Sequence, residues 1–203
     1  MKKHYSFALS IAAIALALTF VMSGNARAGG GDKAAATIGS TIADFKSTDL
    51  SGKDQTLNAL RGKNATALIF ISAQCPVVKD YMERISKLAA DYRARGVTVV
   101  GIYSNATESK DDIKAHAAVN NLTFPVLRDS GNKIADQLGA ERTPEVFLLD
   151  SANKLVYHGR IDNHRNITLV NANDLRDAID ATLAGKPVVK TEAAAFGCTI
   201  KRA

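Results

Sequence analysis

The chain has few cysteines, with only Cys75 and Cys198 among its 203 residues. That number excludes a fold held together by a disulfide scaffold, and it excludes a structural zinc site built on cysteine pairs. The content of 46% hydrophobic and 23% charged residues is that of an ordinary globular protein, so disordered and collagen-like proteins are excluded too. The sequence therefore predicts a domain that is stabilised by its hydrophobic core.

Apolar runs long enough to cross a membrane are also missing. The run at residues 7–22 is shorter than the roughly 20 residues that span a bilayer core. Lys2 and Lys3 precede it, and Ala26-Arg27-Ala28 follows it shortly afterwards. A basic start, a short apolar run and a small-x-small site are typical of a secretory signal peptide, so we expect cleavage after Ala28 that removes residues 1–28.

The net positive charge of the chain is small once residues 1–28 are left out. Its three basic residues and no acidic ones leave 23 of the 26 basic side chains against 20 acidic, a net charge of +3. This excess does not indicate binding to nucleic acid, nor a stable membrane association after signal cleavage. We expect a periplasmic or secreted protein in an oxidising compartment, where two cysteines can pair.

Apolar periodicity predicts an α/β domain with a mixed central sheet flanked by helices. We expect a hairpin and one helical turn within 38–60, followed by strands at 67–71, 97–103, 123–127, 145–150 and 155–158, and by helices from 76 to about 95, at 109–120, 133–138 and 173–183. The domain would cover 38–185. A flexible leader (29–37) would precede it, and an extended tail (186–203) carrying Cys198 would follow it.

Cys75 lies between the predicted strand 67–71 and the start of the long helix, where Pro76 suits the first helical turn. Unpaired N–H groups and the positive end of a helix favour a thiolate, which is the nucleophilic form of the side chain. Ser72 is placed to donate a hydrogen bond to this sulfur or to a bound substrate. The alternative, by residue type alone, is an inert buried cysteine.

Together these segments resemble the thioredoxin fold and, within it, the redoxin branch of peroxiredoxin-like proteins, which includes alkyl hydroperoxide reductase and thiol-specific antioxidant proteins. The matching segments span nearly the whole chain after residue 28; they are Cys75-Pro76-Val77-Val78, 96–102, 124–129, 143–147, 155–162 and the terminal Gly-Cys-x-Ile-Lys motif at 197–201. The resemblance implies a cis peptide bond between Thr143 and Pro144 that faces Cys75. We expect the chemistry to need no cofactor and no metal ion.

The sequence also departs from the patterns of these families. Position 78 is Val, so the Cys-x-x-Cys dithiol of thioredoxins cannot form, and Leu68 stands where peroxiredoxins have the proline of Pro-x-x-x-Thr/Ser-x-x-Cys. The peroxiredoxin arginine that polarises peroxide has no clear match. Pro144 stands near its place, Arg142 is two residues away, and Arg160 is another cationic candidate.

We interpret the chain as an exported thiol oxidoreductase with an antioxidant role, which reduces peroxides or disulfides through Cys75 and takes electrons from an external thiol reductant. Cys198 is either a resolving cysteine or half of a permanent disulfide that fixes the tail. The second case would make the protein a non-enzymatic binding module. A third alternative is a metallochaperone that uses His158, Asp162 and His164, but such proteins need a second, closely spaced cysteine.

The first testable prediction concerns export. Protein recovered from the cell envelope should have a mature N-terminus at or near Gly29, because the signal elements end at Ala28. Intact-mass measurement checks this prediction. Recovery of the protein in a membrane fraction with Met1 retained would contradict it.

Overall fold

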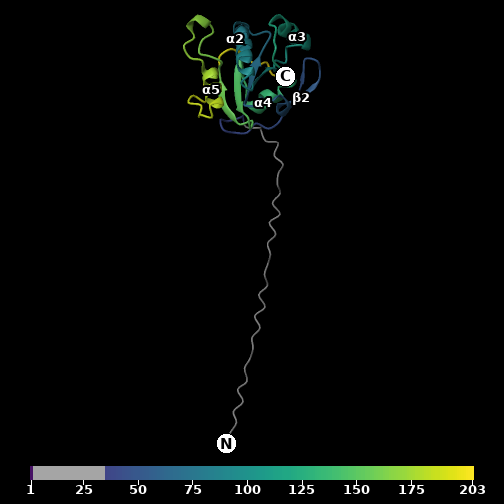
Figure 1. Cartoon of the computed structure of the whole chain (residues 1–203). Coiled ribbons are helices and arrows are strands. Elements are labelled where there is room, and N and C mark those ends of the chain that lie inside the picture. Colours follow the sequence, from purple (N-terminus) through teal and green to yellow (C-terminus); the bar gives the residue numbers. More distant parts are fainter. Residues whose placement is uncertain (2–34) are drawn as a thin grey trace. The chain divides into compact units, whose positions relative to one another are not determined.

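A computed structural model describes Met1 and residues 35–203 (Figure 1). The expected signal peptide, apart from Met1, and residues 29–34 of the expected leader lie outside the described residues. Residues 35–203 belong to one compact unit.

A mixed seven-stranded sheet forms the centre of this part, in the order β2-β1-β5-β4-β3-β7-β8. Its strands are β1 (Lys46–Asp49), β2 (Asp54–Thr56), β3 (Ala65–Ile71), β4 (Val97–Tyr103), β5 (Val126–Arg128), β7 (Glu145–Asp150) and β8 (Leu155–Gly159). β3 pairs in parallel with β4 and antiparallel with β7, and all of its residues are buried. Its continuous apolar run is explained by this central position, since both faces of the strand are covered.

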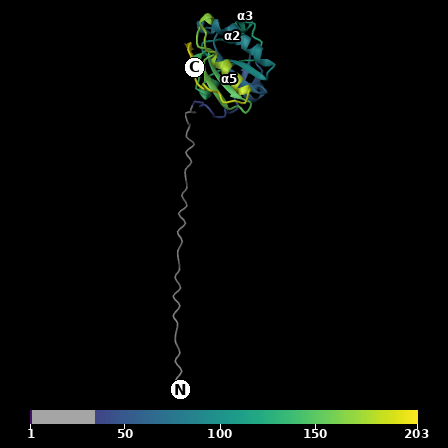
Figure 2. The same ribbon diagram turned by 60° about the vertical axis from the view of Figure 1, so that its left-hand side comes forward.

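Helices cover both faces of the sheet (Figures 1 and 2). They are α1 (Leu57–Leu60), α2 (Pro76–Arg93), α3 (Lys110–Val119), α4 (Lys133–Leu138) and α5 (Asp174–Leu183), with a 3-10 turn η1 (Ile167–Leu169). Ile69 and Ile71 of β3 pack in one core cluster with α2 and α5, whereas Leu68 and Phe70 pack in the other with α1 and α4. The predicted α/β architecture is confirmed.

One expected strand is displaced. Strand β5 begins at Val126, whereas the sequence pattern placed the strand at 123–127. Pro125 has no N–H to give to a strand ladder, although its carbonyl oxygen accepts from the N–H of Gly101 at 2.9 Å. The apolar pattern therefore locates the strand but not the residue at which it begins.

A second, two-stranded sheet has no counterpart in the sequence prediction. It pairs β6 (Arg142–Thr143) antiparallel with β9 (Cys198–Thr199), which belongs to the tail. The tail also packs beyond β9, because Ile200 is only 3% exposed and lies in the core cluster with α4. Figure 1 shows the C-terminal end of the chain near α4. The tail therefore packs against the domain through β9 and Ile200.

Two glycines let the tail approach the body of the domain closely. A Cβ on Gly197 would lie 2.0 Å from the carbonyl oxygen of Thr143, and a Cβ on Gly159 of β8 would lie 2.1 Å from that of Ala193. Real Cβ atoms do not come so close to a backbone oxygen. The tail path therefore requires glycine at both positions.

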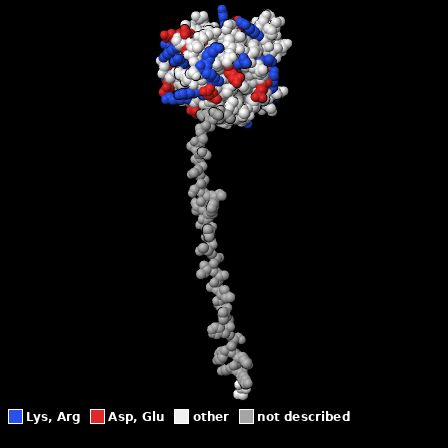
Figure 3. Space-filling view, turned by 180° about the vertical axis from the view of Figure 1, so that it is seen from behind, with Lys and Arg blue, Asp and Glu red and all other residues white. Residues whose placement is uncertain are grey.

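Among the described residues, no helix combines the length and the apolarity that crossing a membrane would require. Basic and acidic side chains are interspersed on the face shown in Figure 3.

The second prediction tests the close approach of the tail. Gly197→Ala should lower the free energy of unfolding by about 2–3 kcal/mol, because its Cβ would overlap a backbone oxygen. Gly131→Ala is the matched control, since Gly131 also has a positive φ but has open space around its Cβ position. It should cost only about 1 kcal/mol. Urea unfolding measures both, and an equal loss in the two variants would contradict the prediction.

Candidate active site around the Cys75–Cys198 disulfide

Cys75 is the N-cap residue of α2 and lies at the end of the segment that follows β3. Its backbone is extended, at φ −93° and ψ 114°, which is the conformation that a following proline imposes. Pro76 is the first helical residue, where no N–H is needed. The predicted placement of the thiol at a helix N-terminus is confirmed.

Cys75 and Cys198 form a disulfide that links two points 123 residues apart in the sequence. Their Cα atoms are 5.9 Å apart, which lies within the usual range for a disulfide. Cys75 is 3% exposed, and Cys198 is half-buried. The structure therefore brings together the two cysteines that the sequence singled out, although a bridge alone suits both a catalytic and a structural role.

Thr143 contacts both halves of this disulfide. It is the strand partner of Cys198, and its carbonyl oxygen lies 3.2 Å from the Sγ atom of Cys75. The peptide bond between Thr143 and Pro144 is cis, as the family resemblance implied. The hydroxyl of Thr143 is buried and has no hydrogen-bond partner among the described residues. The disulfide therefore packs against the backbone of the segment before Pro144.

Ser72 is linked to a carboxylate that the sequence did not reveal, that of Glu108. The Ser72 hydroxyl donates to Glu108 Oε1 at 2.6 Å and accepts from the N–H of Gln74 at 3.1 Å. The N–H of Gln74 also lies 3.1 Å from Glu108 Oε1. Glu108 is only 1% exposed. Ser72 thus helps to fix the segment that leads into Cys75, and its hydroxyl donates its hydrogen bond to Glu108.

Glu108 also affects two neighbouring titratable groups. Burial, and to a smaller extent the charge of Glu108, raises the pKa of Tyr103 above its ordinary value. Burial lowers the pKa of His116, and the charge of Glu108 opposes this effect. The Tyr103 hydroxyl lies 2.7 Å from His116 Nδ1, so a neutral His116 can accept a hydrogen bond from that hydroxyl. No sequence pattern pointed to Glu108, because an isolated acidic residue before a helix resembles a surface residue.

The two candidate arginines lie in different surroundings. Arg160 forms an ion pair with Asp174 at 2.7 Å, where Asp174 begins α5. Arg142 is exposed on β6, and its Nη1 atom lies 3.5 Å from the carbonyl oxygen of Gly197, the residue before Cys198. The structure therefore places Arg142 beside the strand that carries Cys198, and it ties Arg160 to α5.

The residues of the metallochaperone alternative have separate partners. His158 pairs with Glu145, Asp162 accepts from Tyr81 and Arg84, and the ring of His164 interacts with the backbone of Asn166; these contacts lie between 2.6 and 3.2 Å. Within residues 35–203, no three His, Cys, Asp or Glu side chains are gathered as metal ligands.

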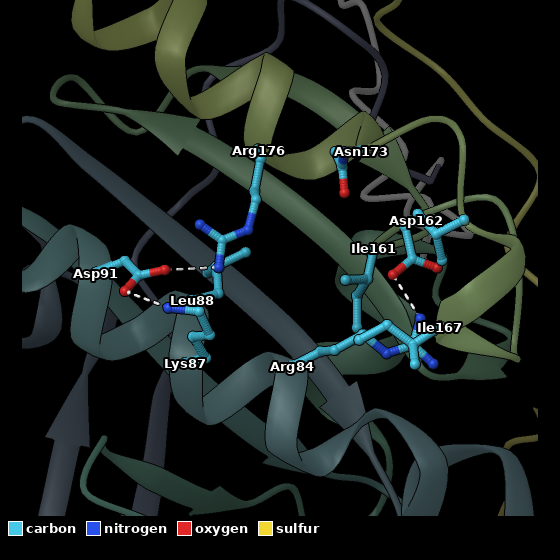
Figure 4. A pocket seen from close by; sticks show the side chains of 10 residues that line it. Arg84, Lys87, Leu88, Asp91, Ile161, Asp162, Ile167, Asn173 and Arg176 are labelled. Atoms are coloured by element: carbon cyan, nitrogen blue, oxygen red, sulfur yellow. Dashed lines mark hydrogen bonds and ion pairs between the residues drawn. The ribbon is translucent and has the colours of Figure 1, made fainter.

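A pocket of about 230 Å³ lies beside α2 (Figure 4), and neither cysteine is among the residues that line it. Its charged side chains largely neutralise one another, because Arg84 pairs with Asp162 at 2.6 Å and Arg176 pairs with Asp91 at 2.8 Å. Lys87 also contacts Asp91, at 3.2 Å. These ion pairs connect α2 to α5 and to the segment after β8, so they serve the fold rather than the thiol chemistry.

The model of the AhpC/TSA family matches residues 38–158, which is more than half of the chain. The chain belongs to the AhpC/TSA family. The predicted membership of a thioredoxin-fold redoxin family is thereby confirmed, and the matched region contains Cys75 and Pro144 but not Cys198.

Two solved structures share most of this AhpC/TSA fold. A hypothetical protein of Sinorhizobium meliloti 1021 is 37% identical, with a TM-score of 0.77 over 83% of this chain and 96% of that one. An uncharacterized conserved protein of Geobacillus kaustophilus is 31% identical, with a TM-score of 0.77 over 82% and 93%. Among curated proteins, the thiol-disulfide oxidoreductase ResA of Geobacillus thermodenitrificans is 30% identical over 61% of this chain and 70% of its own length.

The third prediction tests the link between Ser72 and Glu108. Ser72→Ala should lower the free energy of unfolding by about 1–3 kcal/mol, because Glu108 would lose a buried donor. Ser86→Ala is the control, since the Ser86 hydroxyl is buried without a partner in the described part of the chain. Its stability should stay within about 0.5 kcal/mol of the wild type. Equal losses in urea unfolding would argue against a special role for Ser72.

Proposed function

We propose that the protein is an exported thiol–disulfide oxidoreductase whose redox-active group is the Cys75–Cys198 disulfide. The observation that carries this proposal is the position of the bridge, between a helix N-terminus and the carbonyl oxygen of Thr143. Similarity to ResA supports disulfide chemistry. The proposed partners are a disulfide substrate and an external thiol reductant, in the periplasm or outside the cell.

The reaction follows from the two sulfur atoms. In the reduced protein, the Cys75 thiolate attacks one sulfur of a substrate disulfide, which forms a mixed disulfide and releases the first substrate thiolate. The Cys198 thiolate then attacks the Cys75 sulfur, which closes the protein bridge and releases the second substrate thiolate. Two thiolates of an external reductant reverse these steps and regenerate the dithiol. The N-terminus of α2 assists by favouring negative charge on Cys75.

Peroxide reduction is the second candidate, and membership of the AhpC/TSA family favours it. Cys75 would attack a peroxide oxygen to form a sulfenic acid and release water or an alcohol. The Cys198 thiol would then condense with that acid to form the bridge and release water. We expect this activity to be slow. The reason is that the Ser72 hydroxyl already donates its hydrogen bond to Glu108 and Arg160 is already paired with Asp174, so neither assists the peroxide.

The fourth prediction separates these activities from a purely structural bridge. Cys75→Ser should abolish both disulfide reduction and peroxide consumption. Cys198→Ser should retain the first oxidation of Cys75 by peroxide but turn over poorly, because the resolving thiol is absent. Without a fixed cation at the peroxide, the wild-type rate should be about 10²–10³ below that of a site that has one. Stopped-flow oxidation and insulin reduction measure these steps.

Thiol counts with and without a mild reductant provide the control. A bridge that opens under mild reductant supports the enzyme. A bridge that resists reductant, together with peroxide consumption in Cys75→Ser equal to that of the wild type, would favour a non-enzymatic binding module.

A further inference from the structure

A second buried carboxylate, that of Glu145, lies directly after Pro144 and takes no part in the steps above. Its side chain is 6% exposed. One oxygen, Oε2, accepts the backbone N–H groups of Glu141 and Arg142, each at 2.7 Å. The other oxygen, Oε1, lies 2.7 Å from His158 Nε2. A carboxylate with three donors is well satisfied, so its burial in this place is stable.

The backbone that Glu145 holds is the one that receives the tail after Cys198. The carbonyl oxygen of Glu141 accepts from the N–H of Ile200 at 2.8 Å, and Arg142 is the strand partner of Thr199. Strands β6 and β9 have two residues each, and an isolated two-stranded ribbon is marginally stable even when it is longer. The charge-assisted hydrogen bonds of Glu145 therefore supply order that the ribbon lacks by itself.

His158 holds the tail on the other side of Cys198. Its backbone N–H donates to Thr191 at 2.9 Å, and its carbonyl oxygen accepts from Ala193 at 3.1 Å. Its ring stacks on Phe147, with ring centres 4.3 Å apart. An ionised carboxylate only accepts hydrogen bonds, so in the tautomer that suits this contact the Nε2 atom of His158 is the donor to Glu145. One side-chain pair thus connects the two sites at which the tail is attached before and after Cys198.

We propose that Glu145 and His158 are positioning residues that hold Cys198 opposite Cys75. The inference rests on the proposed function, in which this bridge opens and closes. Since the cysteines are separated by 123 residues, the frequency with which their thiols meet in the reduced protein depends on how firmly the tail is held. Loss of the pair should favour the open dithiol over the bridge.

The experiment is a redox equilibrium between the full-length protein and mixtures of reduced and oxidised glutathione. In this reaction two glutathione thiols are oxidised to one glutathione disulfide while the protein bridge becomes two thiols. Acid quenching, alkylation and mass measurement give the oxidised fraction. Glu145→Ala should lower the equilibrium constant for bridge formation about tenfold, which corresponds to about 30 mV. Glu145→Gln, which keeps one acceptor oxygen, should give an intermediate value.

Asp129→Asn is the matched control, because Asp129 is also a buried carboxylate that accepts two backbone N–H groups, those of Ile134 and Ala135. It should lower the melting temperature but leave the bridge constant within about twofold of the wild type. A purely structural role would destabilise oxidised and reduced protein equally and would not change this constant. An equal constant in Glu145→Ala and the wild type, or an equal shift in Asp129→Asn, would overturn the inference.

If Glu145→Ala does not fold, Glu145→Gln and His158→Gln carry the test, with an expected fall of about threefold in each. Wild-type constants in both would overturn the positioning role. A wild-type bridge that no glutathione mixture opens would instead contradict the proposed function, and with it the inference. The two failures are therefore distinguishable.

Discussion

The pairing of Thr143 with Cys198 is the contact on which the rest of the site depends. A helix N-terminus can favour a thiolate at Cys75, but position 78, where thioredoxins have their second cysteine, is Val in this chain. The domain takes its second sulfur from a strand near the end of the chain. That strand must be held against the entropy of a long intervening segment, and the backbone of Thr143 is its anchor point.

Two buried carboxylates set the geometry on the two sides of the bridge. Glu108 accepts the N–H of Gln74 just before Cys75, and Glu145 accepts two N–H groups just before Thr143. Donors reach both oxygens of Glu145, whereas Glu108 Oε1 accepts from Ser72 and Gln74 and its buried Oε2 has no partner among the described residues. The disulfide therefore joins two segments whose backbone N–H groups both donate to buried carboxyl groups.

The sequence predicts the large elements of this fold and only part of the site. β3 and α2 have clear apolar patterns, and the position of Cys75 between them follows from those patterns. Strands β6 and β9 have two residues each, which is too few to show an alternating apolar pattern. The sequence therefore left the pairing of Cys198 open. Glu108 and Glu145 were missed because burial of an acid depends on distant donors, which local sequence does not reveal.

Opposing fields act on Cys75 once the bridge opens. The N-terminus of α2 favours an anion there, whereas the Thr143 carbonyl oxygen, 3.2 Å from the sulfur, favours a thiol that can donate to it. Because the disulfide carries no charge, neither the helix end nor the carbonyl oxygen favours or disfavours it strongly. A thiolate at Cys75 would therefore meet a favourable helix end on one side and an unfavourable carbonyl oxygen on the other. Because Cys198 is paired with the same segment, Thr143 contacts both sulfur-bearing residues, one through its carbonyl oxygen and the other through strand pairing.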